Sequence, residues 1–287
     1  WEGIGQLIAL HVGGKIILQP LQLNLSINIP EAKLWNIYRW SIYPQQRRQA
    51  ALLLVAKSKD SLLRSQRLLA GQGWGNDPMA AIALKIKGQI HERLGQNLQA
   101  RSLWTKLLGR FAYLPAAADA YYSLGRTDIQ LRFRLMQLHP SHPASLASAV
   151  ELGKSGELTN KGAIHLARWG ARWPGAEELI RGACVNPSNR ALTSDQRQIL
   201  AQGLATLGDG SAALKCLDNQ SSLPSTAIFV GKALLKGGIE EIQQGEKLLV
   251  KLTQDHPKSS ESIQAKKLLS ENVSSSKSWL KTLPNYL

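Results

Sequence analysis

The stretch that decides the fold is PMAAIALKIKGQIHERLGQNLQARSLWTKLLGRFAYLPAAADAYY, residues 78–122. In its first part, apolar residues recur at helical spacing until Gly95, which is expected to end a helix. A second apolar face starts at Leu98 and continues through Leu103, Leu107 and Leu108. The pattern therefore predicts two helices joined by a short turn.

Four residues of this predicted hairpin stand at an informative spacing. Gly88 and Ala100 are small where two helices must approach closely, and the bulky Trp104 lies one turn beyond Ala100. Together with Gly95, they are spaced as in a tetratricopeptide-like helix pair, whose period is about 34 residues. Later segments repeat the same helix–Gly/Pro–helix texture. We therefore predict an all-α fold, an antiparallel helix-pair superhelix of the tetratricopeptide-like α-solenoid type.

Composition agrees with helices and suggests three parts. The chain has 287 residues, 44% of them apolar, and Phe, Met and Tyr are few. We expect residues 1–30 to be an extended or irregular N-terminal segment and residues 31–270 to be the superhelical repeat domain. Residues 271–287, which include NVSSSKS, are expected to be a linker toward a missing C-terminal catalytic domain.

The first 30 residues are the least helical in pattern. Residues 4–18 are apolar but interrupted, which fits either the remains of a signal or anchor segment or an irregular lead-in. Between Pro20 and Pro30, apolar and polar residues alternate, which predicts a strand. With no evident partner strand, it is expected to be an extended arm laid on the helices. The start at Trp1 rather than Met suggests a fragment or a processed product. The sequence contains no run of 18 uninterrupted apolar residues, so it predicts no membrane span.

The charge of the chain is strongly positive and uneven. The formal net charge is +15, and residues 1–140 carry 18 Lys/Arg against 7 Asp/Glu. Such a field favours polyanions, although a merely solubilising basic surface is an equal alternative. The candidate residues for binding a polyanion or a glycan are arginines of the basic half: Arg47, Arg48, Arg64, Arg67, Arg93, Arg101 and Arg110.

Residue types that carry chemistry do not assemble into a motif. His139 and His142 are three apart, but the prolines beside them favour a helix terminus over a metal site. The glycines of GQGWGNDP, residues 71–78, lack the strand and the Gly-Lys-Ser/Thr that a phosphate-binding loop needs. We expect no catalytic residue, metal or cofactor. Cys184 and Cys216 could pair in an oxidising compartment, but two packed core cysteines are the favoured interpretation.

Four segments resemble a known family. Residues 47–84, 108–126, 139–153 and 162–176 resemble the helical amino-terminal region of cyanobacterial proteins of the soluble lytic transglycosylase family; the most distinctive segment is GAIHLARWGARWPGA, residues 162–176. The resemblance covers most of the chain, roughly residues 31–270. It implies an α-superhelix that supports a small lysozyme-like domain near the carboxyl end. That domain cleaves peptidoglycan glycan strands, forms a 1,6-anhydro sugar and uses one glutamate as acid and base.

The resemblance also implies a location and partners, and it has a limit. The implied location is the periplasm or cell envelope, and the implied partners are peptidoglycan or a C-terminal lysozyme-like domain. The family's catalytic glutamate lies in a Glu-Ser motif followed by Gly-Leu-Met-Gln. This chain has Glu261-Ser262 without that second segment, so Glu261 is expected to be an early-helix glutamate favoured by the helix dipole. The chain is expected to contain only the scaffold.

A second function class stays open. A tetratricopeptide-like array could instead be a stand-alone adaptor that binds a protein partner in its concave groove. RNA binding is disfavoured, because no base-reading pattern repeats along the array.

Overall fold

A computed structural model describes the backbone of residues 5–12, 15–22, 29–58, 61–156, 159–185, 192–217 and 222–282. These residues form fifteen α-helices, preceded by one β-hairpin. The chain divides into two compact units, Trp1–Ser145 and Leu146–Leu287.

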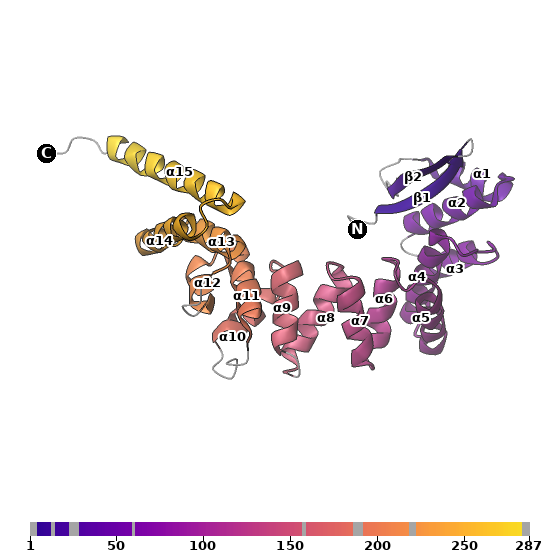
Figure 1. Cartoon of the computed structure of the whole chain (residues 1–287). Helices are drawn as coiled ribbons and strands as arrows, with labels where there is room; N and C mark the ends of the chain where they lie inside the picture. The colour runs from indigo at the N-terminus through magenta and orange to yellow at the C-terminus, as the bar shows by residue number, and fades with distance from the viewer. Residues whose placement is uncertain are drawn as a thin grey trace. The chain divides into compact units, whose positions relative to one another are not determined.

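The first unit holds the β-hairpin and seven complete helices. The helices are α1 (Glu31–Trp40), α2 (Pro44–Lys57), α3 (Leu62–Leu69), α4 (Pro78–Arg93), α5 (Asn97–Phe111), α6 (Ala117–Gly125) and α7 (Ile129–Leu138), coloured indigo to magenta in Figure 1. The boundary between the units falls within α8 (Pro143–Lys154).

The second unit holds the remaining helices. These are α9 (Thr159–Trp169), α10 (Ala176–Val185), α11 (Ser194–Leu207), α12 (Gly210–Leu217), α13 (Pro224–Leu234), α14 (Ile239–Asp255) and α15 (Ser260–Thr282). Helix α10 lies within the predicted superhelical region, residues 31–270, but its bounds were not predicted. Helix α15 continues to Thr282, through part of the segment that was expected to be a linker.

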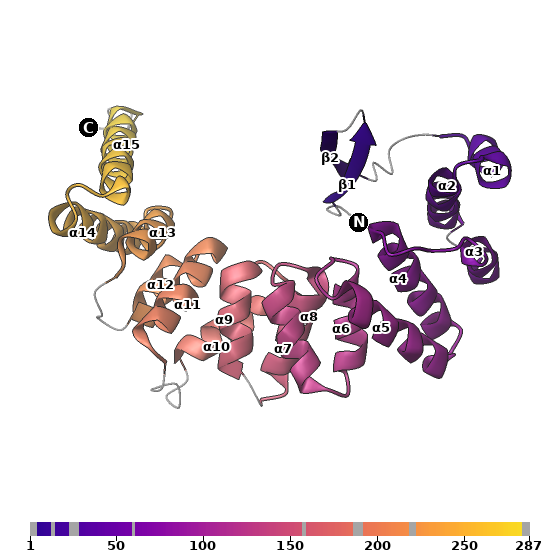
Figure 2. The ribbon, with the colours of Figure 1, turned by 45° about the vertical axis from the view of Figure 1, so that its right-hand side comes forward.

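Packing between helices is local in the chain. In the first unit, the main contacts join successive helices from α1 to α7, with smaller ones between α2 and α4 and between α4 and α6. In the second unit, α11 packs on α9, α10, α12 and α13, and α14 packs on α13 and α15. Both views of the structure show α4 beside α5 and α6 beside α7 (Figures 1 and 2). Within each unit, the main packing thus joins helices at most two apart.

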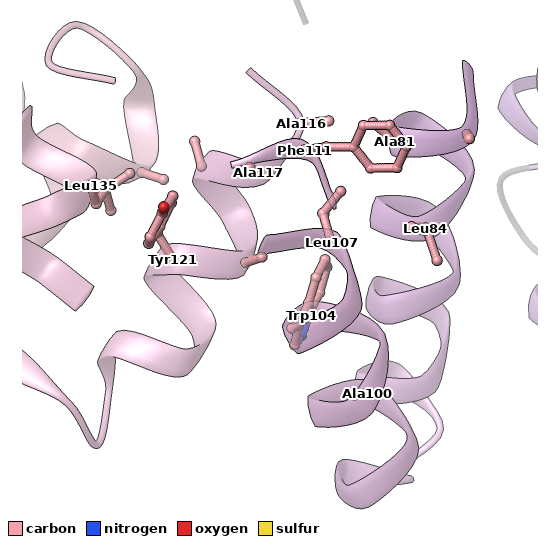
Figure 3. Close-up of a cluster of buried hydrophobic side chains, with 14 residues drawn as sticks. Ala81, Leu84, Ala100, Trp104, Leu107, Phe111, Ala116, Ala117, Tyr121 and Leu135 are labelled. Atoms are coloured by element: carbon pink, nitrogen blue, oxygen red, sulfur yellow. The ribbon is translucent and has the colours of Figure 1, made fainter. Parts of the chain in front are cut away.

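The α4–α5 hairpin confirms the spacing argument made from the sequence. A Cβ added at Gly88 would lie 2.7 Å from Cζ2 and Cη2 of Trp104, so only glycine leaves room for the indole. Trp104 is almost fully buried, with Ala100 and Leu107 beside it on α5 (Figure 3). Its Nε1 donates a hydrogen bond to Glu92 Oε1 at 2.9 Å. Close backbone approach and a satisfied indole nitrogen together fix the pairing of the two helices.

The ends of α4 also follow the sequence signals. Asp77 caps its N-terminus by accepting a hydrogen bond from the backbone nitrogen of Ala80 at 2.9 Å, and Pro78 occupies the first turn. After its last residue, Gly95 has φ +71°, in the left-handed region that favours glycine. The chain can therefore reverse into α5.

The N-terminal segment differs from the expectation. Strands β1 (Gly5–Val12) and β2 (Lys15–Gln22) pair antiparallel, with Gly5 opposite Gln22 and Val12 opposite Lys15. The expected unpaired strand was placed later, at residues 21–29, of which 23–28 lie outside the described residues. The sequence does carry a hairpin signal here, because Gly13-Gly14 stands between two apolar runs. Pro20 is tolerated in β2 because an edge strand leaves some N–H groups unpaired.

The model also bears on membrane insertion. Within the described part of the chain, no helix combines the length and the apolar character that crossing a bilayer requires.

Candidate functional site

The seven candidate arginines all lie in the first unit, but they do not form one cluster with one role. They are distributed over four helices: Arg47 and Arg48 on α2, Arg64 and Arg67 on α3, Arg93 on α4, and Arg101 and Arg110 on α5. In some of them the guanidinium group is paired with other residues of the chain, and in the others it has no such partner among the described residues.

Two of them hold the glycine-rich connector between α3 and α4. Arg48 donates to the carbonyl oxygen of Gln72 at 3.4 Å and forms an ion pair with Asp77 Oδ2 at 3.0 Å. Arg110 donates to the carbonyl oxygen of Gly75 at 2.9 Å and to the side chain of Asn76. These guanidinium groups satisfy backbone and side-chain acceptors of the connector, so their first role is structural.

Four others have no hydrogen-bond or ion-pair partner for their guanidinium among the described residues. Arg67, Arg93 and Arg101 are exposed, and Arg47 is half-buried. Exposed cations of this kind can meet an anionic ligand without first breaking an internal ion pair.

Arg64 belongs to a network that joins α3 to α1. It forms an ion pair with Glu31 Oε1 at 2.5 Å, and the same oxygen accepts a hydrogen bond from Trp35 Nε1 at 3.1 Å. The hydrogen bonds from Trp35 and Arg64 lower the pKa of Glu31 below its ordinary value. Glu31 therefore stays ionised and offsets much of the charge of Arg64.

A groove lies between these two helices. It is open to solvent and has a volume of about 530 Å³, and its lining residues are Trp35, Tyr38, Ser61, Leu63, Arg64, Arg67 and Leu68. We call this the α1–α3 groove. The guanidinium carbons of Arg64 and Arg39 lie over the Trp35 ring, 5.2 Å and 5.1 Å from its centroid.

Sequence reasoning found the two arginines that line the groove and missed Arg39, which adjoins it. Arg64 and Arg67 were candidates, whereas Arg39 was not. The signal for Arg39 was its position four residues after Trp35 on one predicted helix, which places the two side chains on the same face. The approach of α3 to α1 could not be inferred, because α2 separates them in the chain.

A buried polar cluster elsewhere in the unit is structural. Lys85 on α4 is buried and lies 2.5 Å from Asp119 Oδ2 on α6. His139 Nε2 lies 3.0 Å from the carbonyl oxygen of Ala112. Among the residues whose side chains are described, no three His, Cys, Asp or Glu residues gather as a metal site would require. His142 caps α8, since its Nδ1 accepts a hydrogen bond from the backbone nitrogen of Ala144 at 3.2 Å.

Glu261 lies where the sequence placed it, in the first turn of α15. The residue is partly exposed, and Oε2 accepts a hydrogen bond from Ser260 Oγ at 2.9 Å. The backbone nitrogen of Glu261, then Ser260, lower the pKa of its carboxyl below the ordinary value. A general acid needs a raised pKa, so this environment disfavours that role.

The two cysteines correct an expectation. Cys184 on α10 and Cys216 on α12 form a disulfide across a separation of 32 residues. The favoured interpretation of two unpaired core cysteines was therefore wrong. The two cysteines are close because α10 packs against α12, a contact that the sequence pattern does not contain.

Comparisons of the chain with protein-family models, with curated proteins and with solved structures find no match. The function proposed below therefore rests on the residues, on their arrangement and on the sequence resemblance described above.

Proposed function

We propose that the helices of residues 31–270 form a tetratricopeptide-like α-solenoid that serves as the non-catalytic scaffold of a peptidoglycan lytic transglycosylase. In this function the array supports a lysozyme-like domain on a neighbouring part of the same protein, or one supplied by a partner, while that domain cleaves murein glycan strands.

The observation that carries the proposal is the α4–α5 hairpin. Its Gly88–Trp104 contact, its turn at Gly95 and its buried Ala100 match the spacing of a tetratricopeptide-like pair. Local packing of the other helices within each unit is compatible with a solenoid built from such pairs. The resemblance of four segments to the helical region of soluble lytic transglycosylases supplies the proposed substrate.

The disulfide supports the proposed location. Disulfides persist in oxidising compartments such as the periplasm and are rare in the cytosol. A Cys184–Cys216 bridge agrees with a protein of the cell envelope. A chain isolated from its native compartment with both thiols reduced would argue against this location.

The test uses purified peptidoglycan and detection of soluble muropeptides by liquid chromatography with mass spectrometry. The chain alone is expected to release no anhydro-muropeptides. Fused to a catalytic domain of the family after residue 287, it is expected to support cleavage faster than that domain alone. A fusion no faster than the isolated domain would contradict the scaffold role.

Glu261 provides the matched variant for this assay. Turnover by the isolated chain that disappears in Glu261→Gln would make the protein an enzyme in its own right. Because Glu261 is partly exposed and Gln has nearly the same shape, the substitution is expected to leave the fold intact.

A further inference from the structure

We propose that the α1–α3 groove binds an acidic peptide segment that also carries an apolar side chain. This inference goes beyond the scaffold function, because it assigns the first unit a protein partner and requires no peptidoglycan.

The polar groups of the groove are mainly hydrogen-bond donors. Arg67 lines it and Arg39 adjoins it, and neither guanidinium has an ion-pair or hydrogen-bond partner among the described residues. Two acceptor atoms nearby are already engaged. Glu31 Oε1 accepts from Trp35 and Arg64, and Ser61 Oγ accepts from the backbone nitrogen of Arg64 at 3.3 Å.

The excess of hydrogen-bond donors over acceptors in the groove favours a carboxylate ligand over a neutral glycan. A guanidinium presents several N–H donors in a fork that matches a carboxylate. A sugar ring presents many hydroxyl groups, each of which also needs an acceptor when it leaves water. The side chains that line this groove offer two such acceptors, the hydroxyl groups of Tyr38 and Ser61.

The Trp35 ring is not an open stacking platform. The guanidinium groups of Arg39 and Arg64 both lie over it, 5.1 Å and 5.2 Å from its centroid. A nucleic-acid base or a sugar ring would need the same surface of the indole. Trp35 instead holds the two cations in place, which lowers the entropy cost of presenting them to a ligand.

The rest of the groove is apolar. Leu68 is buried beneath it, and Leu63 is 60% exposed at its edge. The same three-helix segment exposes further large apolar side chains at Trp40, Ile42 and Tyr43. Exposed apolar surface beside cations favours a partner that combines acidic and apolar residues, as an acidic peptide does.

The test is fluorescence anisotropy with the full chain and a fluorescein-labelled peptide that repeats Glu-Glu-Leu. Arg39→Gln and Arg67→Gln are each expected to weaken binding by about three- to fivefold, the upper part of the range measured for exposed charge pairs. The double variant is expected to bind the peptide about tenfold more weakly. Arg101→Gln is the matched control, because it removes the same charge from an exposed site on α5.

Two peptide variants test the ligand chemistry. Replacing every Glu by Gln is expected to abolish binding, and replacing every Leu by Ser is expected to weaken it. Leu63→Ser should weaken binding of the original peptide more than binding of the peptide with Ser in place of Leu, because only the original peptide makes the apolar contact that the substitution removes. Circular dichroism verifies that each protein variant keeps its helices.

Two results would overturn the proposal. Equal effects of Arg67→Gln and Arg101→Gln would show only a general attraction of charges. Displacement of the peptide by a carboxylated oligosaccharide or by an oligonucleotide, at equal or lower concentration of charge, would assign the groove to that other class of ligand.

Discussion

At the scale of single residues, one close contact organises the first unit. Trp104 is the largest of the fully buried side chains in the described residues, and it occupies the space left by the missing side chain of Gly88. Its indole nitrogen is satisfied by Glu92, which also accepts a hydrogen bond from Ser123 on α6. A single glycine therefore permits a contact that links three helices.

Gly88→Ala is expected to destabilise the protein by about 1–3 kcal/mol, the usual cost of overpacking a core. The new Cβ would lie 2.7 Å from the Trp104 ring. The control is Gly109→Ala on α5, where an added Cβ meets nothing within 4 Å. That change should stabilise the helix by up to about 1 kcal/mol. Chemical denaturation measures both, and equal effects would contradict the packing argument.

His142 gives the first unit a dependence on pH. Burial lowers its pKa below the ordinary value, with Lys85 and His139 acting in the same direction and Asp119 opposing them. The unfolded chain therefore takes up this proton before the folded chain does as the pH falls. Protonation of Nδ1 would also remove the acceptor that caps α8.

The contribution of His142 to stability should thus be complete above about pH 6.5 and decline as the pH falls toward the folded-state pKa. His142→Asn keeps a capping acceptor at every pH. Comparing unfolding free energies at about pH 8 and about pH 5 should show a smaller loss for the variant. An equal loss in both proteins would rule out this role for His142.

At the scale of helices, the disulfide joins two elements that are not consecutive. It closes a loop of 32 residues between α10 and α12 around α11. Replacing both cysteines by alanine is expected to lower the free energy of unfolding by about 3–4 kcal/mol, mostly through the larger entropy of the unfolded chain. Denaturation with and without a reductant measures it. The unfolding free energy of the alanine variant should not change with the reductant, and that of the wild-type protein should fall. If the reductant changed neither value, the bridge would be contradicted.

The helices that were predicted correctly are those with local signals. Asp77-Pro78 and Gly95 mark the two ends of α4 by capping and by positive φ, and these requirements can be recognised from neighbouring residues alone. The disulfide and the α1–α3 groove depend on which helices meet in space, a property that short-range periodicity does not contain. The roles of Arg48 and Arg110 were missed for the same reason, since their partners lie 24 to 35 residues away.

At the scale of the whole molecule, the excess of positive charge is the dominant feature. Residues 1–140 carry a net charge of +11. If this surface attracts peptidoglycan, binding to purified peptidoglycan should fall as salt rises, because mobile ions screen exposed charges. Binding that ignores salt, or no binding at low salt, would contradict an electrostatic attraction.

The structure sharpens that experiment by separating two pairs of arginines. Replacing the exposed Arg93 and Arg101 by Gln should weaken binding and reduce its salt dependence. Replacing Arg48 and Arg110 removes the same charge, but it should act first on the connector that they hold. Hydrogen exchange at residues 71–77 should rise in the second pair only. Circular dichroism gives the control for overall folding.

The local packing within each unit has a mechanical consequence. When each helix is held mainly by its neighbours in the chain, a force on the two termini can detach helices one pair at a time, rather than breaking one common core. The disulfide would stop this process at one place. It shields about 32 residues from extension, which shortens the fully stretched chain by roughly 110 Å at about 3.4 Å per residue. Reduction would release that length, so the bridge sets how far the chain can extend under load.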